Sequence, residues 1–315
     1  MVSRHALSIL EALPDHPLRR DALTTAGVPR HTLVELVGAG LVTTPFYGVV
    51  TRGDAPDTLE HRATAARLVL PEGATLCRAT AAWLRGIDAR PPGAHRQAPP
   101  LECAVPRGRT PVRRPGLRCY ETDLLAEDVV EVAGLPCTTV ERTAVDLARW
   151  SVPGMGLAVL DAMARRGLVV PADLLPITQR WSGDRFIARA RRLVSLCDPA
   201  AESYGESWLR LRFHDAGFPP PELQISLVGP DGVERRRLDL GYREKRYAWE
   251  YDGEEFHAGL RAEATDRWRR AQIERDWGWT VVGVGKNLVL GPSMALERGI
   301  GEVVGVLPLI RRRTW

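Results

Sequence analysis

The stretch RRRLDLGYREKRYAWEYDGEEFH, residues 235–257, decides the fold of the C-terminal part of the chain. Apolar and polar side chains alternate along Arg237–Gly241 and again along Tyr247–Asp252. Alternation with a period of two is typical of β-strands that have one buried face. The residues between the two runs include Glu244 and Lys245, where a tight turn can form. We therefore predict a β-hairpin.

This hairpin brings acidic side chains together. A tight turn at Glu244-Lys245 places Asp239 directly across from Glu250, and Arg237 across from Asp252. Like charges on neighbouring strands lie about 4.5–5.5 Å apart and destabilise a sheet unless something neutralises them. Carboxylate oxygens are the ligands that Mg²⁺ and Mn²⁺ prefer. A divalent cation is one explanation; an exposed hairpin with solvated acids and Arg237 as local counter-ion is the other.

The residues upstream add a third acid. A predicted helix begins after Pro199, ends at Gly217, and carries Glu202 and Glu206 four residues apart on one face. A strand around Gln224–Val228 follows it. The order is therefore helix, three strands, helix and strand, which predicts a small α/β domain.

Three runs in this region resemble a known family: ESYGESWLRLRFHDAGFPPPELQ, the hairpin stretch above, and DRWRRAQIERDWGWTVV. They resemble bacterial domains related to very-short-patch repair endonucleases, within the PD-(D/E)XK nuclease superfamily. The resemblance implies a restriction-endonuclease-like α/β fold with catalytic acids Glu206, Asp239 and Glu250, the Tyr251 carbonyl as a further metal contact, and His257 close by. The implied reaction is metal-assisted hydrolysis of a phosphodiester, with Mg²⁺ or Mn²⁺ as cofactor.

One position departs from that family. The lysine expected two residues after the acidic strand position is Asp252 here. His257 could replace it as general base, because the ordinary pKa of histidine lies near neutrality. Lys245 or Lys286 could substitute from a neighbouring element, and a structural histidine capped by Asp252 remains open. We keep Asp252 and His257 among the candidate catalytic residues.

The next predicted helix offers basic groups. Asp266 and Arg270 stand four residues apart and can form an ion pair. Arg267 and Arg269 are candidates for DNA phosphate contacts. The alternative is an ordinary solvated helix face.

The N-terminal residues follow a different pattern. Helical spacing covers residues 3–13, 19–26 and 29–39, and two short apolar runs follow at 41–44 and 47–51. Three short helices and a hairpin are the order of a winged helix-turn-helix.

Two further runs, GVPRHTLVELVGAGLVTTPFYGVV and TTVERTAVDLARW, resemble AbiEi-type antitoxins. This resemblance implies a DNA-binding module with Arg30, His31 and Thr32 at the exposed start of the recognition helix. Residues 1–60 contain five arginines but seven carboxylates, whereas DNA binders usually present a basic face. Either other residues share the DNA contact, or the module binds protein.

The middle of the chain is a mixed α/β segment. We expect a helix at Thr75–Leu84, strands near Leu101–Val105 and Leu117–Tyr120, and a helix from Thr139. Seven arginines and one acid lie between Arg90 and Arg118. A solvated pair of loops and a nucleic-acid contact both fit this basic stretch.

Composition sets the remaining limits. The 315 residues have 44% hydrophobic and 26% charged residues, as in ordinary globular proteins. Five cysteines without CxxC spacing argue against a disulfide framework or a zinc cluster. No apolar run is long enough for a membrane span, and no signal peptide is evident, so we expect a cytoplasmic protein.

The sequence thus predicts a multidomain α+β or α/β protein. The expected divisions are a winged helix-turn-helix at 1–55, an AbiEi-like α/β region at 56–170, a helical linker at 171–198 and the nuclease-like domain at 199–315. The leading interpretation is a DNA-binding, metal-dependent endonuclease. The alternative is a non-catalytic transcriptional regulator or antitoxin, with a toxin or another protein as partner.

Overall fold

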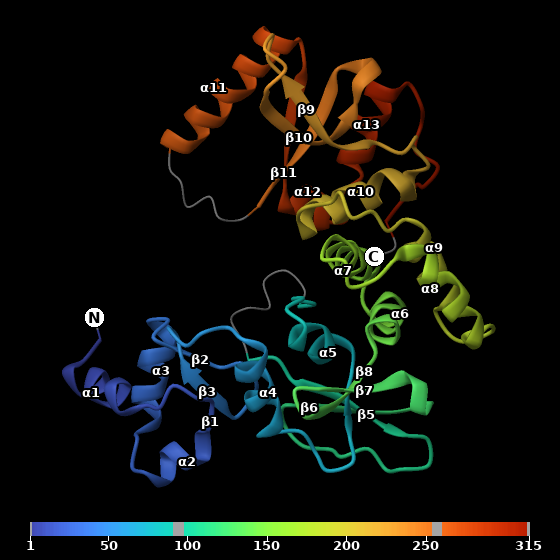
Figure 1. Cartoon of the computed structure of the whole chain (residues 1–315). Helices are drawn as coiled ribbons and strands as arrows, with labels where there is room; N and C mark the ends of the chain where they lie inside the picture. The colour runs from blue at the N-terminus through green and yellow to red at the C-terminus, as the bar shows by residue number, and fades with distance from the viewer. Residues whose placement is uncertain (1, 91–97, 254–259, 314–315) are drawn as a thin grey trace. The chain divides into compact units, whose positions relative to one another are not determined.

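The computed structural model describes residues 2–90, 98–253 and 260–313, without the side chains of 260–265 (Figure 1). It divides into two compact units, Met1–Leu147 and Ala148–Trp315. The expected mixed α/β organisation with several sheets is confirmed. The finer division into four segments stays a prediction.

The N-terminal elements build a small antiparallel sheet beside three helices. They are α1 (Arg4–Ala12), β1 (Leu18–Arg19), α2 (Arg20–Thr25), α3 (Arg30–Gly38), β2 (Val42–Thr43) and β3 (Val49–Arg52). The strands pair in the order β1-β3-β2. The Ser3 hydroxyl caps α1 by accepting a hydrogen bond from the Ala6 N–H at 3.2 Å. The three helices and the hairpin agree with the sequence pattern, but β1 is too short to leave a pattern of its own.

The rest of the first unit is a five-stranded mixed sheet in the order β6-β5-β4-β8-β7. Its elements are α4 (Leu59–Arg67), β4 (Thr75–Leu76), α5 (Arg78–Leu84), β5 (Leu101–Pro106), β6 (Leu117–Thr122), η2 (Ala126–Asp128), β7 (Val129–Val132), β8 (Leu135–Thr138) and α6 (Val140–Trp150), which continues past the unit boundary. The strands expected near 101–105 and 117–120 are confirmed.

The helix expected at Thr75–Leu84 is wrong at its start. Thr75 and Leu76 form β4, because they pair with Ala104 and Cys103 of β5. This non-local pairing overrides the local helical pattern. The helix α5 begins only after them.

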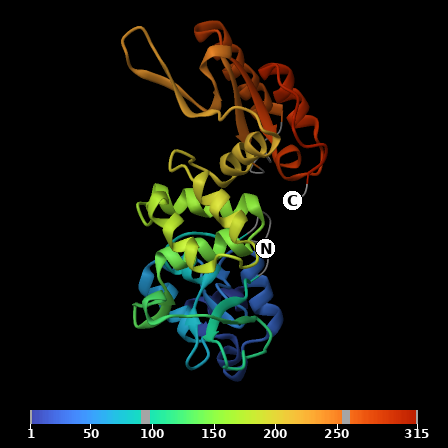
Figure 2. The same cartoon turned by 90° about the vertical axis from the view of Figure 1, so that its right-hand side faces the viewer.

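The second unit starts with helices and ends with a four-stranded sheet. The helices are α7 (Pro153–Arg165), α8 (Pro171–Ile177), η3 (Thr178–Trp181) and α9 (Ile187–Ser195). The sheet follows with α10 (Tyr204–Ala216), β9 (Glu222–Val228), β10 (Glu234–Tyr242), η4 (Arg243–Lys245), β11 (Tyr247–Asp252), α11 (Leu260–Trp277), β12 (Thr280–Gly285), α12 (Lys286–Leu290) and α13 (Ala295–Val304). Its strand order is β12-β11-β10-β9, and the hairpin of β9 and β10 is seen from the side in Figure 2.

The predicted hairpin register is confirmed. Strand β10 pairs with β11 through Leu240 and Trp249, Gly241 and Ala248, and Tyr242 and Tyr247. The same register continued by one residue places Asp239 across from Glu250. The turn residues Arg243–Lys245 form the short helix η4.

Two details near this hairpin differ from expectation. Helix α10 begins at Tyr204 with Ser203 as its N-cap, so Glu202 lies outside the helix. Arg237 is not the counter-ion of the hairpin acids: its side chain forms an ion pair with Glu202 at 2.8 Å, and Asp252 forms one with Arg270.

Glycine lets α10 approach the sheet closely. A Cβ atom on Gly205 would collide with the ring of Tyr251 on β11. Gly205 is in the first turn of α10, directly before Glu206. The contact therefore requires glycine and holds the start of α10 against the strand that carries Glu250.

Candidate functional site

Three of the predicted acids gather where α10 meets the hairpin of β10 and β11. Glu206 lies in the first turn of α10, Asp239 on β10 and Glu250 on β11. Glu206 is 6% exposed and Glu250 5% exposed. The charges of both carboxylates act on Asp239, which places all three within one electrostatic neighbourhood.

Protein groups already bind the oxygens of two of these acids. Oε2 of Glu206 accepts hydrogen bonds from the Glu202 N–H at 2.9 Å and from Nε2 of Gln224 at 2.8 Å. Oδ2 of Asp239 accepts one from the Tyr251 N–H at 2.9 Å. Glu206 thus ties the residue before the N-cap Ser203 to the start of α10, a structural role close to that of the glutamate in a capping box, which accepts from the N-cap N–H itself.

Glu250 is held by an arginine of α11. Nη1 of Arg269 donates to Oε1 of Glu250 at 2.9 Å, and Nη2 donates to Oε2 at 2.5 Å. This two-pronged arrangement is the strong form of an arginine–carboxylate pair. The hydrogen bonds to Glu250 raise the pKa of Arg269. A guanidinium group therefore lies against the acid expected to hold the metal.

A second arginine–carboxylate pair lies at the end of β11. Nη2 of Arg270 donates to Oδ2 of Asp252 at 3.0 Å. A Cβ atom on Gly283 would collide with both partners, so glycine on β12 leaves room for the pair. The predicted pair of Asp266 with Arg270 is wrong: Asp266 lies 3.6 Å from Arg269 instead.

Burial and neighbouring charge shift Asp239 strongly. Burial is the largest cause, and the charges of Glu206 and Glu250 add to it. Together they raise the pKa of Asp239 from 3.8 to about 7, although the Tyr251 N–H and Arg269 oppose the shift. Near neutral pH this carboxyl group is divided between its neutral and charged forms.

This shift predicts a pH dependence of stability. The folded protein holds the Asp239 proton up to about pH 7, whereas the unfolded chain releases it near pH 3.8. The contribution of Asp239 to the free energy of unfolding therefore falls as the pH rises from 3.8 to about 7. We expect the free energy of unfolding of Asp239→Asn, measured by urea denaturation at several pH values, to lack this fall with pH. Glu244→Gln, at the exposed turn of the same hairpin, is the matched control. An unchanged slope in Asp239→Asn would contradict the assignment.

The described acids do not fit a divalent cation in this arrangement. Arg269 takes both oxygens of Glu250, and protein donors already bind Glu206 and Asp239. Among the residues that the structure describes, no group of three or more His, Cys, Asp or Glu side chains is placed to hold a metal ion. His257 lies outside the described residues. The Mg²⁺ or Mn²⁺ site stays a prediction that depends on Arg269 leaving Glu250.

The residues expected to contact DNA have different surroundings. Arg30 and His31 are exposed in the first turn of α3, as expected. Thr32 is only 1% exposed, so its expected place at the exposed start of the helix is wrong. In α11, Arg267 is exposed, whereas Arg269 is engaged with Glu250.

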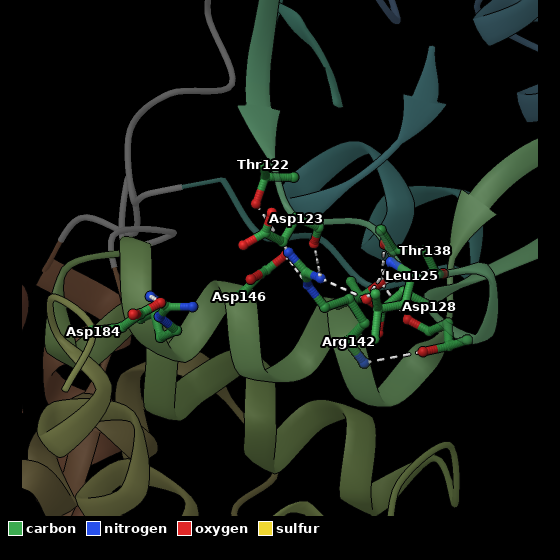
Figure 3. Close-up of polar contacts among 11 residues, drawn as sticks. Thr122, Asp123, Leu125, Asp128, Thr138, Arg142, Asp146 and Asp184 are labelled. Carbon is green, nitrogen blue, oxygen red and sulfur yellow. Dashed lines mark hydrogen bonds and ion pairs between the residues drawn. The ribbon is translucent and has the colours of Figure 1, made fainter. Parts of the chain in front are cut away.

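A second polar cluster, centred on Arg142 of α6, was not predicted from the sequence (Figure 3). Arg142 is 2% exposed. Its Nε donates to Asp146 at 2.8 Å, and its Nη1 donates to Asp128 at 2.9 Å and to the Asp123 carbonyl at 2.8 Å. Its Nη2 donates to Thr122 at 3.2 Å. The four-residue spacing of Arg142 and Asp146 within TTVERTAVDLARW was the available signal for this cluster.

The comparisons with known proteins bear on this same region. Residues 74–196, which include the Arg142 cluster, match the family described as AbiEi antitoxin C-terminal domain. The antitoxin part of the sequence resemblance is therefore supported over these residues.

Two relatives in Mycobacterium tuberculosis cover most of the chain. They are uncharacterized protein Rv2248 of strain ATCC 25618 / H37Rv and uncharacterized protein MT2308 of strain CDC 1551 / Oshkosh. Each is 32% identical over 252 residues, which is 80% of this chain and 88% of the relative. The chain belongs to the family of these two proteins.

Within the described residues, no helix combines the length and the apolar character that a bilayer crossing requires.

Proposed function

We propose that this chain is a DNA-binding regulator of the antitoxin type whose nuclease-like domain does not hydrolyse DNA. The observation that carries this proposal is the match of residues 74–196 to the AbiEi antitoxin C-terminal domain. A toxin or another protein is the partner that this class of protein is expected to bind.

The N-terminal elements support the DNA-binding part of the proposal. Three helices and a three-stranded antiparallel sheet follow one another in the order of a winged helix-turn-helix. In such a module the helix that follows the turn lies in the major groove and contacts bases with its first residues. Arg30 and His31 hold that position in α3 and are exposed.

Arg269 supports the non-catalytic part. A restriction-endonuclease-like domain needs its acids for a cation, but here the guanidinium group of Arg269 neutralises Glu250. Asp252 stands where the lysine of the nuclease family is expected, and Arg270 binds it. Both acids of β11 are thus used for ion pairs within the fold.

The second candidate function is a Mg²⁺- or Mn²⁺-dependent endonuclease. The proximity of Asp239 to Glu206 and Glu250, with the raised pKa of Asp239, is the observation that favours it. A cation would relieve the repulsion among these acids. This function requires α11 to withdraw Arg269.

DNA binding tests the leading proposal directly. Duplexes selected by the full-length protein from a random-sequence pool are titrated by fluorescence anisotropy at fixed salt. We expect the double variant Arg30→Ala, His31→Ala to bind about tenfold more weakly, because base contacts typically contribute about 1–3 kcal/mol. Arg4→Ala removes an exposed positive charge from α1 instead and should bind within about twofold of the native protein.

Two outcomes would count against the proposal. If no duplex is selected, the N-terminal module does not bind duplex DNA. If the double variant binds selected duplexes as tightly as the native protein, the contact is made elsewhere. Plasmid nicking with Mn²⁺ that is lost in Asp239→Ala and in Glu250→Ala would favour the endonuclease.

A further inference from the structure

A basic cavity lies in the second unit, away from the acidic cluster. It has a volume of about 370 Å³ and lies among α9, α10, α13 and the segment 310–313. Two carboxylates line it together with five arginines, which are Arg189, Arg192, Arg212, Arg312 and Arg313. Ligand cavities in proteins typically measure about 300–1,000 Å³, so its size is that of a small-molecule site.

Both carboxylates in the lining are already neutralised. Nη2 of Arg212 donates to Oε2 of Glu297 at 2.6 Å, Nε of Arg212 binds the other oxygen, and both side chains are fully buried. Asp215 forms an ion pair with Arg192 at 2.5 Å. Among the described residues, neither acid forms an ion pair with Arg189 or Arg312.

Among the described residues, Arg189 in the cavity wall forms no ion pair with a carboxylate. Its Nη2 donates to the Arg149 carbonyl, and its guanidinium group lies 4.4 Å from the centre of the Phe186 ring. Its Nε is buried and faces no hydrogen-bond acceptor among the described residues. Burial lowers the pKa of Arg189. A buried donor without an acceptor calls for an explanation, and a bound ion or ligand is one.

Arg312 brings a second positive charge to the cavity from the C-terminal segment. It is exposed, and no carboxylate in the described part of the chain forms an ion pair with it. Pro153 and Ile310 supply apolar surface in the same lining.

We propose that this cavity binds the phosphate group of a nucleotide-sized ligand, with Arg189 and Arg312 as the charged contacts. A phosphate monoester carries up to two negative charges, which complement the positive charges of Arg189 and Arg312. The planar fork of arginine fits phosphate oxygens in pairs. Pro153 and Ile310 would contact the apolar part of the ligand. The ligand is a free nucleotide or the 5′-terminal phosphate of a nucleic-acid strand, since both present the same group.

Calorimetric titration of the full-length protein at low salt tests this proposal. The probes are AMP, adenosine, and one single-stranded oligonucleotide with and without a 5′-phosphate. We expect AMP to bind and adenosine not to bind. Tighter binding of the phosphorylated oligonucleotide than of AMP identifies a strand end as the ligand, and the reverse order identifies a free nucleotide.

The variants locate the site. Arg189→Gln and Arg312→Gln should each weaken AMP binding by about tenfold or more, because each removes a charge-assisted contact. Arg311→Gln is the matched control, since this exposed neighbour does not line the cavity. Arg312→Gln keeps the test valid if Arg189→Gln unfolds, because Arg312 is exposed and Arg189 is not.

Three results would overturn the proposal. They are no heat with AMP or the phosphorylated strand, equal binding of AMP and adenosine, or AMP binding that Arg312→Gln leaves unchanged. None of them depends on whether residues 1–60 bind duplex DNA, so this test and that of the proposed function fail separately.

Discussion

Replacement of Arg142 by alanine lowers the free energy of unfolding of the first unit by about 3–5 kcal/mol. Arg142, Asp128 and Asp146 are each no more than 5% exposed. Without the guanidinium group, two buried carboxylates lose their shared counter-ion, and the Asp123 carbonyl loses a donor. The cost comes mainly from the buried charges left behind rather than from the lost attraction.

Amide hydrogen exchange on the full-length protein measures this effect within the five-stranded sheet. Arg107→Ala is the matched control, because Arg107 pairs with Asp123 at the surface, with side chains 74% and 57% exposed. Exposed pairs contribute about 0–1 kcal/mol. Adding Asp128→Asn and Asp146→Asn to Arg142→Ala should recover part of the loss. Equal hydrogen-exchange protection in Arg142→Ala and Arg107→Ala would contradict this prediction, because the buried carboxylates would then not depend on Arg142.

The Arg142 cluster and the hairpin show what the sequence could and could not predict. The register of β10 and β11 depends on a local alternation and a short turn, so pairing of Asp239 with Glu250 followed from the pattern. Arg142, by contrast, gathers groups from β6, the β6–β7 connection and α6, and only its contact with Asp146 is local. The distant partners leave no periodic signal.

Short strands and buried polar residues were missed for similar reasons. The strands β7 and β8 span four residues each, with a turn between them, and gain their stability from the sheet. The antitoxin resemblance implied that Thr32 is exposed at the start of the recognition helix, but α3 turns it into the core. Only the packing of the helix against its neighbours decides such a position.

The candidate site differs from expectation because Arg269 binds Glu250. Arg267 and Arg269 were both candidates for phosphate contact, with a solvated helix face as the alternative, since nothing in the local sequence separates them. Arg269 is 19 residues from Glu250, and the position of α11 against the sheet decides that they meet. The sequence pattern identified Glu250 as a site residue, but only the packing of α11 against the sheet places Arg269 beside it.

Replacement of Arg269 is therefore expected to have the second large effect on the free energy of unfolding. We expect Arg269→Ala to lower the free energy of unfolding of the second unit by about 3 kcal/mol in EDTA, because Glu250 stays buried beside Asp239 without a cation. Millimolar Mn²⁺ should then restore stability in this variant, since a ligand that binds only the folded state at about 100 times its Kd adds about 2.7 kcal/mol. The native protein, whose Glu250 is already neutralised, should gain little.

Urea unfolding with and without Mn²⁺ distinguishes the non-catalytic regulator from the metal-dependent endonuclease. Arg267→Ala, an exposed change on the same helix, should match the native protein under both conditions. A gain from Mn²⁺ limited to Arg269→Ala, and lost again in Arg269→Ala with Asp239→Asn, means that the acids can hold a cation but that Arg269 excludes it. An equal gain in the native protein means that Arg269 yields readily to the metal, and the non-catalytic proposal would then give way to the endonuclease.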